Sequence, residues 1–295
     1  MNERVRVHVA GRELELSNLD KVLYPEVGFT KGEVIDYYVR VAEVILPHLR
    51  GRPLTRIRYP NGVNAASFFE KNAPAGTPDW VRRQTLPVPG SSSGRDTLDF
   101  VIVDEVATLV WLANLAAIEL HTPQWRVVDD KAGDPDLLVA DLDPGPPAGL
   151  AECCLVAIAA RQRFDVDGLT PYPKTSGKKG MQLMCRLPPG WSSDEVATYA
   201  RAVAEDLERA LPELVTARMT KSLRPGKVFF DWSQNVAAKT TVSAYSMRAA
   251  ATPTVSAPFT WEEVEAGAVR PLGPDEVLAR IEELGDLLAP LVLAS

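Results

Sequence analysis

The chain has 295 residues, of which 46% are hydrophobic and 24% charged, a composition typical of a globular protein with a real core and not of a disordered chain. No apolar run approaches the roughly 20 residues of a membrane-spanning helix, and the charged N-terminus has no signal-peptide core, so we expect no membrane partner. Three cysteines, two of them adjacent, give neither a disulfide framework nor zinc spacing, and we expect a cytoplasmic protein with free thiols.

The net charge of −7 argues against a generic basic protein that coats nucleic acid, but this charge is unevenly distributed. Residues 249–295 contain two basic and eight acidic residues. Residues 174–248 contain 12 basic and 7 acidic residues, and residues 21–83 contain 10 and 6. An acidic C-terminal region therefore hides two basic tracts. These tracts alone are weak evidence for DNA binding, because most charged runs are solvated faces.

In the first half of the chain, turn residues separate short strands from helices. Thr30 and Glu33 form a capping box, which predicts the start of an amphipathic helix. We also expect a hairpin over 5–16, strands over 54–59 and 67–71, a Pro/Gly/Ser-rich loop over 74–94, and a helix over 103–120 that is apolar on almost every side and therefore buried.

In the second half, predicted strands alternate with helices. Ser192 and Glu195 form another capping box at the start of a long helix. We expect helices over 150–164, 192–211 and 274–290, and strands over 137–142, 170–174, 181–187, 227–232 and 239–245. This order predicts an α+β fold in which helices flank central mixed or antiparallel sheets.

Two carboxylates end an apolar strand. Asp141 and Asp143 are two residues apart, so their side chains project from the same face of that strand. Such a pair repels unless a hard cation such as Mg²⁺ or Mn²⁺ binds it. A solvated acidic turn before Pro144 is the alternative, and the tripeptide alone does not choose between them.

Two further segments carry candidate chemistry. The loop KTSGKKG, residues 174–180, offers glycine N–H groups, the Ser176 hydroxyl and the ammonium groups of Lys178 and Lys179, which could cradle a polyphosphate, although it is not a Walker A motif. Asp231 ends an apolar strand and would need a partner if buried. Arg224 lies in a basic loop upstream of Asp231, and Arg248 downstream could bind phosphate through its two-pronged guanidinium. Three strand-end carboxylates with a basic loop are the requirements of two-metal nucleotidyl transfer.

Several motifs in fixed order resemble the polymerase domain of bacterial ligase D, of the archaeo-eukaryotic primase superfamily. These are ADLDPG (140–145), KTSGKKGMQL (174–183), MTKSLRPGKVFFDWSQN (219–235) and AYSMR (244–248). Upstream segments SNLDKVLYPE, RPLTRIRYPNG, SFFEKNAP and HTPQWRV are also similar, so the resemblance covers roughly residues 10 to 290.

The resemblance implies a primase-like polymerase that extends primer 3′ ends at gaps and double-strand breaks in non-homologous end joining. It implies a single domain over 1–295, with DNA and 5′-phosphate binding in 1–130 and the metal and nucleotide site in 131–295. It further implies two Mn²⁺ or Mg²⁺ ions, nucleoside triphosphate substrates with a preference for ribonucleotides, and Ku and a DNA ligase as partners.

Residue roles follow from the same resemblance, position by position. It implies that the metal-binding catalytic residues are Asp141, Asp143 and Asp231. It implies that the nucleotide-binding residues are His121, Ser176, Lys179, Gln182, Arg224 and Arg248. It implies that the DNA-binding residues are Lys21 and Lys31, at the 5′-phosphate of the downstream strand, and Phe68 and Phe69, which stack on the template.

The chain departs from the family pattern at a few positions. Gln182 stands where many relatives have histidine, which makes a phosphate contact neutral, and Ile57 replaces a basic residue that contacts the template. No Lys-x-Asp-Gly adenylation motif is present, so we expect a stand-alone polymerase or one module of a longer protein, without ligase activity. His8 and His48 are expected at the surface.

Two other functions stay open. One is a DNA-end-binding module that recognises a 5′-phosphate without catalysis. It would gain nothing from three clustered carboxylates. The other is a different metal-dependent phosphotransferase or hydrolase. The pair Phe68–Phe69 and the basic tracts favour an extended nucleic-acid substrate over a small one.

Overall fold

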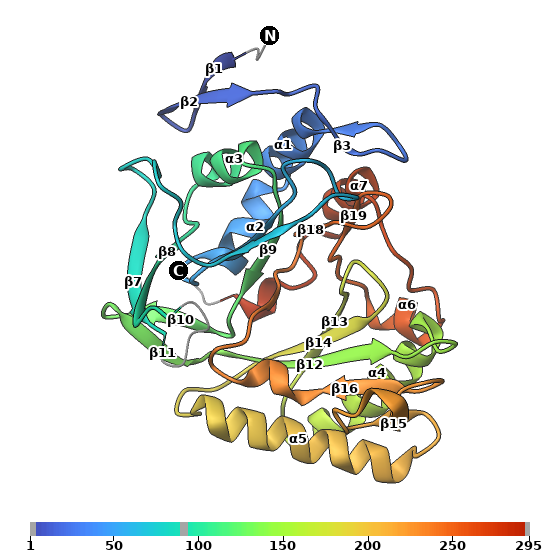
Figure 1. The fold of residues 1–295 in the computed structure, drawn as a ribbon. Coiled ribbons are helices and arrows are strands. Elements are labelled where there is room, and N and C mark those ends of the chain that lie inside the picture. The colour runs from blue at the N-terminus through green and yellow to red at the C-terminus, as the bar shows by residue number, and fades with distance from the viewer. Residues whose placement is uncertain (1–3, 89–93, 293–295) are drawn as a thin grey trace.

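The computed structural model describes residues 4–88 and 94–292. Two sheets and the helices that cover them make up most of it (Figure 1). The α-helices of the described ranges are α1 (Lys31–Arg40), α2 (Ala42–Leu49), α3 (Val106–Asn114), α4 (Leu150–Val166), α5 (Ser193–Ala210), α6 (Trp261–Glu265) and α7 (Pro274–Leu284). Short 3-10 helices are η1 (Lys221–Leu223), η2 (Trp232–Asn235) and η3 (Ala289–Leu291).

A five-stranded sheet forms the lower half of the molecule in Figure 1. Its strands, in spatial order, are β13 (Pro171–Thr175), β14 (Met181–Arg186), β12 (Leu137–Pro144), β16 (Val228–Asp231) and β15 (Val215–Thr216). All neighbours pair antiparallel except β15 and β16. Helices α4 and α5 pack on the face of this sheet that points away from the rest of the chain (Figure 1).

A four-stranded sheet lies above the first, next to α1, α2 and α3 (Figure 1). Its strands, in spatial order, are β17 (Thr241–Val242), β9 (Ala117–Thr122), β5 (Thr55–Arg58) and β6 (Phe68–Glu70). Two-stranded ribbons surround the sheets: β1 (Arg4–Val9) with β2 (Arg12–Ser17), β3 (Val22–Tyr24) with β4 (Phe29–Thr30), β7 (Arg83–Pro87) with β8 (Thr97–Val101), β10 (Trp125–Val128) with β11 (Lys131–Pro135), and β18 (Met247–Arg248) with β19 (Thr254–Val255).

Both predicted capping boxes form. The Thr30 hydroxyl accepts the N–H of Glu33, whose carboxylate accepts the N–H of Thr30 at 2.7 Å. Ser192 and Glu195 make the same reciprocal bonds at the start of α5. These helices begin where the sequence predicts because a cap satisfies N–H groups that have no partner within the helix.

The predicted helix over 103–120 is wrong in its second half. The helix ends at Asn114, Ala116 takes a left-handed backbone with φ 58°, and the chain continues as β9. An apolar run fits a buried helix and a buried strand equally well, so its periodicity could not separate them. Pairing of β9 with β5 and β17 decides the outcome.

Three other predicted boundaries move. The strand expected over 239–245 shrinks to Thr241–Val242, because Tyr245 has φ 63°. The helix expected over 274–290 ends at Leu284, where Gly285 with φ 70° breaks it. The loop expected over 74–94 contains strand β7, and its residues 89–93 lie outside the described part.

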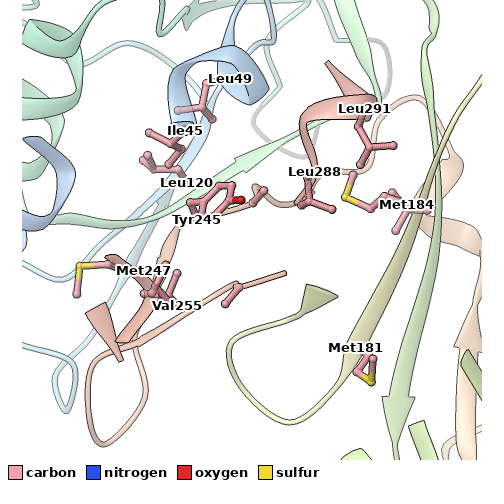
Figure 2. Close-up of a cluster of buried hydrophobic side chains, with 14 of the residues drawn as sticks. Ile45, Leu49, Leu120, Met181, Met184, Tyr245, Met247, Val255, Leu288 and Leu291 are labelled. Carbon is pink, nitrogen blue, oxygen red and sulfur yellow. The ribbon is translucent and has the colours of Figure 1, made fainter. Parts of the chain in front are cut away.

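One hydrophobic cluster joins both sheets. Figure 2 shows Ile45 of α2 and Leu120 of β9 in the same cluster as Met184 of β14, with Leu288 and Leu291 of the C-terminal segment beside them. The two sheets therefore share a core, which fixes residues at their adjoining edges relative to one another. Within the described ranges, none of the helices is both long and apolar enough to span a bilayer.

Candidate active site

A row of four polar side chains crosses the five-stranded sheet. Strand pairing places Lys174 opposite Gln182, Gln182 opposite Asp141, and Asp141 opposite Asp231. Residues directly opposite each other on neighbouring strands share a face and lie close together. Asp143 is two residues beyond Asp141 on β12 and belongs to this face as well. The three predicted catalytic carboxylates therefore meet at the paired ends of β12 and β16.

The charges of these carboxylates disturb one another. Burial, and then the neighbouring charges of Asp143 and Asp231, raise the pKa of Asp141 to about 7 although Gln182 donates a hydrogen bond to it. Burial and the charge of Asp231 also raise the pKa of Asp143, while the charges of Arg224, Lys179 and Arg248 oppose that rise. Carboxylates in this conflict are natural ligands of a hard divalent cation.

Asp231 has partners of its own. Its Oδ1 accepts the N–H of Ser233 at 3.0 Å and the hydroxyl of Ser233 at 2.6 Å, and its Oδ2 accepts the Gln234 side-chain amide at 2.8 Å. Within residues 4–88 and 94–292, no group of three or more His, Cys, Asp and Glu side chains is already arranged to hold a metal ion. The donor chemistry of the three aspartates fits a divalent cation, and the side chains would have to close around it.

The KTSGKKG loop joins β13 to β14 directly above this face. Its turn is closed by the Ser176 N–H, which bonds the carbonyl oxygen of Gly180 at 2.8 Å, and by the Gly180 N–H, which bonds Ser176 Oγ at 3.2 Å. Gly180 approaches so closely that a Cβ there would lie 2.4 Å from the carbonyl oxygen of Leu142. The Lys179 side chain is exposed, and its charge reaches Asp143.

A buried glutamate that the sequence did not single out organises the basic side of the site. Glu119, 1% exposed on β9, bonds His121 Nε2 at 3.0 Å and Lys178 Nζ at 2.9 Å and pairs with Arg248 Nε at 3.2 Å. The N–H of Ala249 donates to it at 3.1 Å. Burial alone would raise the Glu119 pKa, but the His121 hydrogen bond and the neighbouring positive charges hold it well below its usual range.

His121 and Arg248, both expected to bind the nucleotide, therefore lie together on Glu119. Burial lowers the pKa of His121, against the effect of its bond to Glu119. Arg248 also donates to the carbonyl oxygen of Ser176 at 2.7 Å, which ties β18 to the KTSGKKG loop. No motif marks Glu119, and it falls in the segment mistaken for a helix. Because side chains alternate along a strand, Glu119 lies on the same face of β9 as His121, two residues later. This spacing was the sequence signal that could have identified Glu119.

Arg224 is another basic residue near the carboxylates. Its guanidinium is centred 3.7 Å from the Phe229 ring and donates to the carbonyl oxygen of Met219 at 3.0 Å. Because its charge acts on Asp143, it belongs to the rim of the same site. Gln182, by contrast, is 4% exposed and bonds Asp141 and Lys174, so its amide lies at the carboxylates.

The predicted DNA-binding residues lie in two other places, and one of them, Lys31, is buried. Lys31 is 4% exposed and donates to the carbonyl oxygen and Oδ1 of Asn114 at 3.0 and 2.9 Å; burial and the nearby charge of Lys21 lower its pKa to about 8. Lys21 is exposed and donates to Asn61 at 3.2 Å. Phe68 and Phe69, 50% and 61% exposed, lie on edge strand β6.

Comparison with known proteins finds relatives that match most of this chain. A family model described as "LigD, primase-polymerase domain" matches residues 30–288. The curated "Multifunctional non-homologous end joining protein LigD" of Mycolicibacterium smegmatis is 48% identical over 278 residues, 94% of this chain and 36% of that protein. The "Bifunctional non-homologous end joining protein LigD" of Bacillus subtilis is 33% identical over 275 residues, 92% of this chain and 43% of that protein.

A solved structure is similar over the whole fold. It is described as "Polymerase Domain from Mycobacterium tuberculosis Ligase D in complex with DNA", with a TM-score of 0.90 and 46% identity, and the match covers 94% of this chain and 97% of that one. The predicted mixed α and β fold is thereby confirmed. The chain spans less than half the length of the curated relatives named above and nearly all of the solved domain.

Proposed function

This chain belongs to the LigD primase-polymerase family, whose domain is a nucleotidyltransferase, and we propose that it extends primer 3′ ends at gaps and double-strand breaks in non-homologous end joining. One observation carries the proposal. Strand register brings Asp141 opposite Asp231 with Asp143 on the same face, and the charges of Lys179, Arg224 and Arg248 converge on Asp143. A negative centre ringed by cations suits a metal-bound triphosphate.

We propose that Asp141, Asp143 and Asp231 hold two divalent cations, Mn²⁺ or Mg²⁺, which when bound activate the primer hydroxyl and stabilise the departing pyrophosphate. The 3′ oxygen forms a bond to the α-phosphorus of the incoming nucleotide, the bond from that phosphorus to pyrophosphate breaks, and the hydroxyl proton is released. Ser176, Lys179 and Arg248 would hold the triphosphate, His121 the region of the sugar, and Arg224 the triphosphate or the primer end.

The DNA-binding part of the proposal rests on two pairs of residues. Lys21 and Lys31 are paired cations suited to a 5′-phosphate, and Phe68 and Phe69 offer exposed rings for base stacking. The solved relative was in complex with DNA, which supports this part. We propose that residues 1–130 chiefly hold the DNA end and that residues 131–295 carry the metal and nucleotide site. His121 would be an exception that reaches across to Arg248.

The family resemblance supports three finer proposals. They are a preference for ribonucleotides, cooperation with Ku, and cooperation with a DNA ligase. The printed names of the curated relatives place those proteins in end joining, and the chain matches only part of their length. A module that binds DNA ends without catalysis is the competing proposal, and the same experiment separates the two.

The test is extension of a primer in a gapped duplex with a 5′-phosphate, with Mn²⁺ and ribo- or deoxynucleotides. We expect wild-type incorporation, and a loss of at least about 100-fold in Asp141→Ala and Asp231→Ala, because metal ligation contributes several kcal/mol to transition-state stabilisation. Asp36→Ala, on an exposed face of α1, is the matched control. Synthesis retained in both site variants would remove the metal assignment, and a wild type that only binds the duplex would favour the competing module.

A further inference from the structure

Lys174 opens the KTSGKKG motif but has no role in the proposed function. Its side chain is 0% exposed, one of the few charged groups of the described residues that are fully buried. A buried ammonium is costly unless hydrogen bonds satisfy it. Lys174 lies at the end of the row Lys174, Gln182, Asp141, Asp231. This position suggests that the buried ammonium serves the carboxylates at the other end of the row.

Three acceptors surround the Lys174 ammonium. Nζ lies 2.5 Å from Gln182 Oε1, 2.7 Å from Ser256 Oγ and 3.1 Å from the carbonyl oxygen of Val242. The Ser256 hydroxyl donates its own proton to the carbonyl oxygen of Thr175 at 2.8 Å, so it can only accept from Lys174. All three bonds therefore need an N–H of the lysine, and only the ammonium has three.

The lysine fixes the orientation of the Gln182 amide. An ammonium cannot accept a hydrogen bond, so the amide oxygen must face Lys174. The amide nitrogen must then face the other way, and it lies 3.0 Å from Oδ1 of Asp141. One oxygen of Asp141 is thus held in a hydrogen bond, and the rotation of the carboxylate is restricted.

We propose that Lys174 is a positioning residue that acts through Gln182 to orient the Asp141 carboxylate for metal binding. Val242 of β17 and Ser256, which directly follows β19, lie outside the five-stranded sheet and tie Lys174, at the end of the row, to these two segments. The inference rests on the proposed function, since it assumes that Asp141 is a metal ligand. Groups that orient metal ligands commonly change metal affinity by about 10- to 100-fold when they are removed.

The test measures binding of Mn²⁺ alone to the full chain, without nucleotide, by the EPR signal of the free ion. We expect Lys174→Met to weaken binding about tenfold or more. Gln182→Met breaks the network one step nearer Asp141 and should have the same effect, and it carries the test if Lys174→Met does not fold. The double variant should be no weaker than the single variants, because both act through one interaction.

Ser256→Ala is the matched control. It removes another partner of the same ammonium and leaves the Lys174–Gln182 bond, so it should lower thermal stability without changing Mn²⁺ affinity. A folded Lys174→Met that binds Mn²⁺ like wild type, or losses that multiply in the double variant, would overturn the inference. Asp141→Ala separates this failure from that of the proposed function: if it leaves Mn²⁺ binding intact, the metal site itself is wrong.

Discussion

Glu119 gathers groups that would otherwise repel one another. Arg248 and Lys178 both carry positive charge; Lys178 pairs with Oε1 of Glu119, and Arg248 pairs with Oε2, which His121 also contacts. The adjacent lysines Lys178 and Lys179 of the KTSGKKG loop thus have different surroundings, since Lys178 pairs with Glu119 and Lys179 stays exposed near Asp143. A single buried carboxylate therefore sets the placement of Arg248 and His121, two of the residues proposed to bind the nucleotide.

We predict that Glu119→Gln lowers the free energy of unfolding at pH 7 by about 3 kcal/mol, because removing one partner of a buried ion pair leaves the others uncompensated. The same variant should raise the KM for nucleotide, since Arg248 loses its anchor. Urea unfolding and primer-extension kinetics measure the two effects. Glu262→Gln, on the first turn of α6, is the control, and equal stability of the two variants would contradict the role of Glu119.

The loop between β13 and β14 depends on two close backbone approaches. A Cβ at Gly180 would meet the carbonyl oxygen of Leu142, and one at Gly177 would lie 2.6 Å from Arg248 Cγ. Glycine is needed here for space, and at Gly177 also for a φ of 72°. The loop can therefore keep its path, with Ser176 bonded to Arg248 and Lys179 near Asp143, only while both positions lack a side chain.

Gly180→Ala should push the loop away from β12, because the new Cβ would clash with the backbone carbonyl oxygen of Leu142, which cannot rotate aside as a side chain could. We expect a loss of about 1–3 kcal/mol in stability and a fall of up to about 100-fold in extension rate, as for other small displacements of catalytic groups. Gly149→Ala is the matched control, since its Cβ would meet nothing closer than 3.9 Å. An active, fully stable Gly180→Ala would show that the loop adjusts freely.

At the scale of the whole molecule, the segment after α7 packs on the core and contacts helix α2 through Asp286. Asp286 accepts hydrogen bonds from the Tyr245 hydroxyl at 2.6 Å and from the N–H of Leu288 at 2.9 Å, and it contacts His48 Nε2 at 2.9 Å. The expectation that His48 lies at the surface is wrong, because its side chain is 9% exposed. Its partner is 238 residues away in the sequence, which gave no sign of the contact.

Asp286→Asn should make the protein less stable by about 1–3 kcal/mol at pH 7. Burial by itself would raise the Asp286 pKa, but the His48 hydrogen bond and charge hold it below the usual value. The Asp286 carboxylate therefore contributes fully to the free energy of unfolding above the ordinary aspartate pKa of about 4. This contribution is lost as the pH falls through the lower pKa that Asp286 has in the folded protein.

The measurement is urea unfolding of wild type and Asp286→Asn at several pH values between 7 and 3. The difference between the two proteins should shrink below about pH 4. Asp275→Asn, whose side chain is 96% exposed, should match wild type throughout. If the stability difference between wild type and Asp286→Asn stays constant down to pH 3, the ionisation of Asp286 does not stabilise the fold.

Local sequence determined much of this protein. Caps at Thr30 and Ser192 set helix starts, and the spacing of Asp141 and Asp143 placed both on one strand face, because such signals act within a few residues. The ordered motifs also indicated the family, which the comparisons confirm. The acidic net charge was a poor guide to function, whereas the positions of the basic tracts were informative.

Only the tertiary structure decided which residues far apart in the sequence contact one another at the site. The pairing of Asp141 with Gln182 joins positions 41 apart, and the contact of Glu119 with Ala249 joins positions 130 apart. Such contacts depend on register and on which strands become neighbours, which no local pattern encodes. For the same reason the apolar run after Asn114 became a strand: its place between β5 and β17, and not its composition, brought Glu119 and His121 to the site.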